Sequence, residues 1–106
     1  DYAYSATLAA LGGVLIKQDR LSEAEETLRE SLRIDEKIGR NNYADHAATL
    51  HELAALLSVK GEYGAAESLL RKALEIIETT LGQQHRQAAT SIHELARVLA
   101  AQGTGR

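Results

Sequence analysis

The sequence repeats itself with a spacing of 42 residues. The segment AATLHELAALLSVKG at 47–61 aligns without a gap with ATSIHELARVLAAQG at 89–103, and about half of the positions are identical. SATLAALGGVLIKQD at 5–19 fits one period earlier, and the segments at 21–36 and 63–78 also align with each other. A fixed period in the range of 20 to 50 residues is typical of solenoid proteins. We therefore expect two and a half copies of one unit.

The composition favours helix in every part of that unit. The chain contains no proline, and alanine and leucine dominate over β-branched residues. Glycines and polar clusters divide the chain into five segments of helical length. The helices are expected at about 2–18, 22–38, 43–60, 64–81 and 86–102. The chain is then an all-α superhelix of five antiparallel helices in one domain.

The repeat boundaries follow from these helices. Repeat 1 is expected at about 2–40, repeat 2 at about 43–82, and the first helix of repeat 3 at about 86–102. The sequence SEAE at 22–25 predicts a capping box, and Asn42 predicts a side-chain cap for the third helix. The glycines that follow Ile38, Lys60 and Leu81 suit left-handed positions at helix ends.

Large and small residues recur in the same order in each copy. The first helices contain Leu8, Leu11, Gly12 and Leu15, then Leu50, Leu53, Ala54 and Leu57, then Ile92, Leu95, Ala96 and Leu99. The second helices contain Ala24 and Leu28, then Ala66 and Leu70. Small residues let two helices approach closely, and aliphatic side chains fill the space between them. The core must be aliphatic, because the only aromatic residues are four tyrosines.

This pattern resembles the tetratricopeptide repeat family, and the 42-residue period is similar to that of its kinesin light chain subclass. The usual aromatic residues are replaced here by Leu or Ile, and Glu36 and Glu78 stand where the second helix usually ends with proline. The resemblance implies a right-handed superhelix. It also implies that the first helices of the repeats line a concave groove that binds peptides or partner proteins.

The tetrapeptide HELA occurs at 51–54 and again at 93–96, and its His-Glu pair matches the start of a zinc hydrolase motif. That motif needs a second histidine four residues after the first, where this chain has Ala55 and Arg97. His46 and His51 are five residues apart and would point about 140° away from each other around a helix. We therefore expect no metal site, no cofactor and no catalytic residue.

The polar half of HELA must face away from the core, since Leu50 and Leu53 face it. By resemblance, this other face is the groove. The candidate partner-binding residues are Ala9, Gly13, Lys17, His51, Glu52, Ala55, Ser58, His93, Glu94 and Arg97. Their mixed charge leaves the sign of the ligand open.

The bulk properties limit the classes of partner. A net charge of −3 gives no reason to expect binding to nucleic acid or to a membrane, and no apolar run is long enough to span a bilayer. The absence of cysteine fits a reducing compartment, so we expect a cytoplasmic protein. The chain starts without methionine and reads as a fragment of something longer.

The leading hypothesis is a non-catalytic module that binds a protein or peptide. Two alternatives remain open. One is self-assembly into a homo-oligomer through the last helix, whose apolar face (Ile92, Leu95, Val98 and Leu99) has no following helix to cover it. The other is a regulatory sensor array within a larger signalling protein.

Overall fold

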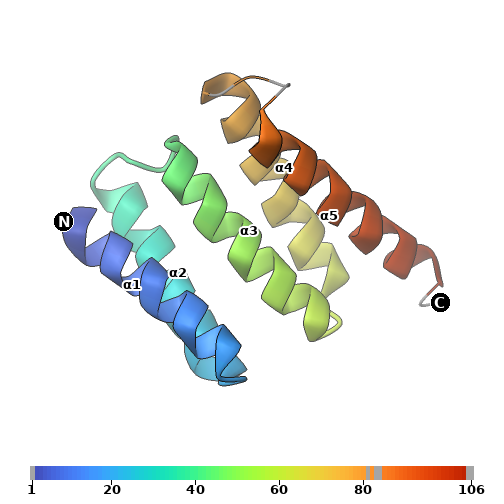
Figure 1. The fold of residues 1–106 in the computed structure, drawn as a ribbon, viewed down its shortest axis with the longest axis horizontal. Helices are drawn as coiled ribbons and strands as arrows, with labels where there is room; N and C mark the ends of the chain where they lie inside the picture. The colour runs from blue at the N-terminus through green and yellow to red at the C-terminus, as the bar shows by residue number, and fades with distance from the viewer. Residues whose placement is uncertain (1, 81, 83–84, 105–106) are drawn as a thin grey trace.

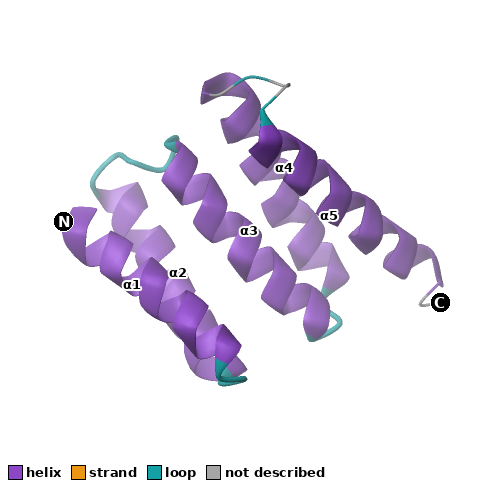
Figure 2. Cartoon of the chain, in the orientation of Figure 1, coloured by secondary structure: helices purple, strands orange, loops and turns teal. Residues whose placement is uncertain are grey.

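A computed structural model describes residues 2–80, 82 and 85–104, and the regular structure of these residues is entirely helical. The helices are α1 (Tyr2–Lys17), α2 (Leu21–Lys37), α3 (Ala44–Val59), α4 (Tyr63–Thr80) and α5 (Arg86–Thr104). Each begins within one residue of the predicted position. The predicted all-α repeat architecture is confirmed (Figure 2). No helix in the described part of the chain is both long and apolar enough to cross a membrane.

The five helices form two layers. In Figure 1, α1, α3 and α5 lie side by side in the layer nearer the viewer, and α2 and α4 lie behind them. Within each repeat, the first helix packs along the second, as α1 packs on α2 and α3 on α4. The faces of α1, α3 and α5 that are turned away from the second layer therefore form one continuous surface.

The turns after the first three helices share one geometry. Arg20, Arg40 and Glu62 each donate a backbone hydrogen bond to the carbonyl five residues earlier, as in a Schellman motif. Gly39 and Gly61 adopt the predicted left-handed conformation, with φ of 77° and 85°, and Asp19 takes this role after α1 with φ of 62°. The predicted left-handed conformation of Gly82 is also found.

The two predicted side-chain caps are wrong. Helix α2 begins at Leu21 with Arg20 at its N-cap, so Ser22 already lies inside the helix. Glu25 therefore does not take part in a capping box. Its carboxylate accepts a hydrogen bond from Lys60 at 2.7 Å, which lowers the pKa of Glu25. Helix α3 has Tyr43 at its N-cap and no side-chain hydrogen bond there. Neither helix therefore starts with a side-chain cap.

Close contact between the helices of repeat 1 depends on a glycine. A Cβ placed on Gly12 would lie 2.5 Å from Cδ2 of the fully buried Leu28. The equivalent residues of repeat 2, Ala54 and Leu70, are also fully buried. The predicted small-to-large contacts are therefore present in both complete helix pairs.

The apolar face of α5 was predicted to stay uncovered, and this holds for two of its four residues. Val98 is fully buried and Leu95 is 9% exposed, because both belong to the core that α4 shares, whereas Ile92 and Leu99 are 49% and 40% exposed. The exposed pair occupies the positions that Leu50 and Leu57 use to pack on α4 one repeat earlier. Among the described residues, no helix covers this side of α5.

Candidate protein-binding groove

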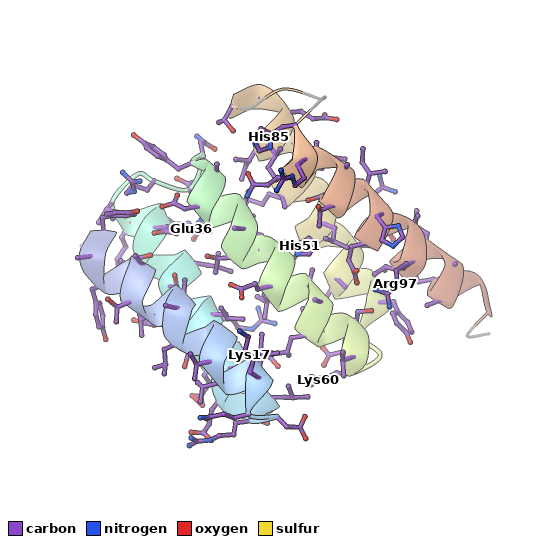
Figure 3. All side chains as sticks on the ribbon, in the orientation of Figure 1. Lys17, Glu36, His51, Lys60, His85 and Arg97 are labelled. Carbon is purple, nitrogen blue, oxygen red and sulfur yellow. The ribbon has the colours of Figure 1, made fainter. Side chains whose placement is uncertain are left out.

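A hollow of about 520 Å³ lies between α1 and α3. We call it the α1–α3 hollow. Its walls carry four of the predicted groove residues, namely Ala9, Gly13, Lys17 and Glu52. They also carry small residues of both helices and polar residues from α2 and α3, including Ala6, Ala48, Thr49, Ser31, Asp35 and Asp45. Figure 3 shows Lys17 beside the gap between these two helices.

A second hollow of about 230 Å³ lies on the other side of α3, toward α5. We call it the α3–α5 hollow. His51 lines it from α3, and Gln87, Thr90 and Ser91 line it from α5. Ala48 and Glu52 line both hollows. These two residues therefore form the ridge between the two halves of the groove.

The remaining predicted residues lie along the same helices but do not line either hollow. Ala55 and Ser58 are partly buried on α3, and His93 is exposed on α5. Arg97 forms an ion pair with Glu94 at 3.0 Å, so these charges neutralise each other. A role for these five residues in binding stays a prediction.

Glu52 stands out among the charged residues of the groove. It forms no hydrogen bond or ion pair within the part of the chain that the structure describes, and partial burial raises the pKa of its carboxyl group. A Cβ on Gly13 would lie 3.1 Å from Glu52 Oε2. Because Gly13 on α1 has no side chain, the Glu52 side chain has space beside it.

A buried polar network at the base of the α1–α3 hollow was not predicted from the sequence. The Ser5 hydroxyl donates to Asp35 Oδ1, and Asp35 Oδ2 lies 2.8 Å from Nδ1 of the fully buried His46. The Ser31 hydroxyl donates to the Ser5 carbonyl at 2.9 Å. The network joins α1, α2 and α3. The available signal was the helical phase of Asp35, which lies four residues after Ser31 and seven after the core residue Leu28.

The order of these groups does not suit nucleophilic catalysis. In a serine hydrolase the histidine stands between serine and aspartate and takes the hydroxyl proton. Here Asp35 stands between Ser5 and His46, and the histidine is on the far side of the carboxylate. The network therefore holds three helices together and does not activate Ser5. Among the described residues, no three His, Asp or Glu side chains gather closely enough to bind a metal ion.

The junction of α1, α2 and α3 has a counterpart one repeat later, where α3, α4 and α5 meet. This second junction carries apolar residues at the equivalent positions. One period later, Ser5, Ser31, Asp35 and His46 correspond to Ala47, Ala73, Ile77 and Ala88. All four of these apolar residues are buried. The architecture therefore tolerates either a polar or an apolar set, and the polar set belongs to the first junction specifically.

The two-layer stack of repeated helix pairs, with small-to-large contacts inside each pair, defines the chain as an α-helical repeat protein. Family models of the tetratricopeptide repeat match residues 5–38 and 45–103. The chain belongs to this family, whose repeats generally serve as protein–protein interaction modules. A search of curated protein sequences finds no match.

Among solved structures, one similar protein is a putative kinesin light chain of Podosopora anserina with nearly identical TPR-like repeats. It has 28% sequence identity to this chain and a TM-score of 0.81. The match covers 97% of this chain but 49% of that one, so the chain spans about half the length of the solved protein. The repeats of this chain are therefore of the kinesin light chain-like kind.

The polar network leads to a stability prediction. Asp35→Ala is expected to destabilise the fold by about 3 kcal/mol, because it leaves the buried Ser5 and His46 without their shared partner. A fourfold variant that copies the second junction (Ser5→Ala, Ser31→Ala, Asp35→Ile and His46→Ala) is expected to be clearly more stable than Asp35→Ala. In that variant no buried polar group is left unpaired, and isoleucine fills space lost with the imidazole. Urea unfolding of both variants measures the difference. A fourfold variant that is less stable than Asp35→Ala would contradict the interpretation.

Proposed function

We propose that the chain is a non-catalytic module that binds a peptide, or an extended segment of a partner protein, across α1, α3 and α5. The observation that carries this proposal is that the two hollows adjoin at Ala48 and Glu52 and run across the first helices of all three repeats. A ligand in the α1–α3 hollow would reach the α3–α5 hollow over one short ridge.

The lining of the groove supports a peptide as ligand. The small side chains of Ala6, Ala9, Gly13 and Ala48 let a bound main chain come close to the helices. Thr49, Gln87 and Thr90 add neutral groups that donate and accept hydrogen bonds. A few polar groups among apolar surface are typical of sites that fix the orientation of a ligand.

Blocking the ridge between the two hollows tests the groove. Ala48→Trp is expected to weaken binding of degenerate octapeptide pools at least about tenfold, because the indole would stand on the ridge and obstruct the passage between the two hollows. Ala65→Trp is the matched control, since Ala65 is exposed on α4 in the other layer. Fluorescence anisotropy measures the affinities, and circular dichroism checks that both variants stay helical. Equal binding by the two variants would place the site elsewhere.

Self-assembly is a second candidate function. The observation that favours it is the exposure of Ile92 and Leu99 on α5, together with exposed Tyr4, Leu11 and Val14 on α1 at the other end of the stack. Exposed apolar faces at the ends of a repeat array are surfaces on which a further helix packs. Each end of the stack thus offers such a face to a second copy.

Self-assembly through α5 predicts an apparent mass that rises with protein concentration. Multi-angle light scattering over a dilution series measures this mass. Leu99→Glu is expected to restore the monomer, because a charged side chain would be desolvated in the interface. Ala65→Glu, at an exposed position on α4, is the control, because it changes the net charge by the same amount. A strictly monomeric protein at the highest soluble concentration would contradict self-assembly and leave the groove proposal intact.

The third hypothesis, a regulatory array within a larger signalling protein, is compatible with the same groove. A cytoplasmic location stays a prediction from the sequence.

A further inference from the structure

The two HELA glutamates occupy equivalent positions but differ in their partners. Glu94 on α5 forms an ion pair with Arg97, one helical turn later. The position equivalent to Arg97 on α3 is Ala55, which has no charge to offer. Glu52 is therefore the member of the pair that the described chain leaves without a cation.

The environment of Glu52 makes this unpaired charge costly. The side chain is partly buried at the ridge between the two hollows, and Gly13 on α1 presents no side chain against it. This partial burial disfavours the charged form and so raises the pKa of the carboxyl group. A cation placed beside Glu52 would regain the lost stabilisation.

The other acidic residues of the α1–α3 hollow already have partners. Asp35 is hydrogen-bonded by Ser5 and paired with His46, and Asp45 lies 3.5 Å from Arg40. The Arg40 guanidinium is itself held against the rings of Tyr2 and Tyr43. Neither aspartate is therefore as available to a ligand as Glu52 is.

Lys17 is the other charged residue of this hollow without a partner among the described residues. Its side chain is exposed to water at the end of α1, and no ion pair joins it to Glu52. An exposed ammonium group loses little by staying hydrated, whereas a partly buried carboxylate gains by pairing. The hollow therefore favours a cationic ligand group, which would pair with Glu52, over an anionic group, which would pair with Lys17.

We propose that Glu52 anchors a cationic side chain, lysine or arginine, of the peptide that lies in the groove. This inference rests on the proposed function and names the ligand chemistry of the same site. The aliphatic stem of the cationic side chain would pass over Ala9, Gly13 and Ala48, and its charged end would meet the carboxylate. Arginine would add the bidentate geometry that a carboxylate accepts best.

Three fluorescein-labelled octapeptide pools test the proposal. They are degenerate over uncharged residues, except at one central position that holds lysine, norleucine or glutamate. The lysine pool is expected to bind about tenfold more tightly than the norleucine pool, which has the same length of apolar chain without the charge. Glu52→Gln is expected to remove this preference, so that the lysine and norleucine pools bind the variant with similar affinity.

Glu94→Gln is the matched control, because it changes the same residue type at the same repeat position, where the charge is already neutralised by Arg97. It is expected to keep the preference for lysine. Lys17→Gln is expected to keep or increase it, since one repelling charge is removed from the hollow. Glu52→Gln is also expected to unfold in urea at least as late as the parent chain, which separates a lost anchor from a lost fold.

The outcomes separate this inference from the proposed function. Binding of all three pools with equal affinity, a preference for glutamate that depends on Lys17, or a lysine preference that survives Glu52→Gln would each overturn the anchor and leave peptide binding in place. Failure to bind any pool would contradict both the anchor and the groove.

Discussion

The architecture depends on one kind of contact, in which a small residue of the first helix admits a large residue of the second. In repeat 1 the contact joins Gly12 and Leu28, and there is no space for even a methyl group on the glycine. In repeat 2 the equivalent residues are Ala54 and Leu70. Because the contact fixes how each first helix is rotated against its partner, it also fixes which residues of that helix face outward. The groove is a consequence of this rotation.

Because the helices pack in the same way in each repeat, the two junctions between repeats can bury different side chains. The first junction buries Ser5, Asp35 and His46 as a hydrogen-bonded set, and the second buries alanine and isoleucine at the same positions. Equivalent positions of the groove also differ in the partners of their side chains. Glu94 is neutralised by Arg97, whereas the equivalent Glu52 faces two hollows and has no partner within residues 2–80, 82 and 85–104. Repetition sets the positions, and single substitutions within it create the differences on which ligand recognition depends.

The period and the spacing of aliphatic residues were sufficient to predict the helices, and the glycines predicted three left-handed turns, because both are set by residues near in sequence. The left-handed Asp19 was not predicted. The predicted caps at Ser22 and Asn42 failed because each helix begins one residue away from its predicted start, which places another residue at the N-cap. The Asp35–His46 pair was missed because it joins different helices, which only the folded arrangement brings together. The sequence left the sign of the ligand open because the candidate residues carry both charges. Glu94 and Arg97 lie three residues apart on α5, so their pairing is local and the spacing alone could have indicated it.

The central claim is that the lack of a side chain at Gly12 is what permits the helix pairing. Comparing Gly12→Ala with Gly13→Ala by urea unfolding tests it most directly, because both substitutions gain the same helix propensity, about 1 kcal/mol. The methyl group at position 12 would overlap buried Leu28, whereas at position 13 it would meet the movable carboxylate of Glu52. We predict that Gly12→Ala is less stable than Gly13→Ala by about 2 kcal/mol. Equal stabilisation by both substitutions would contradict the claim.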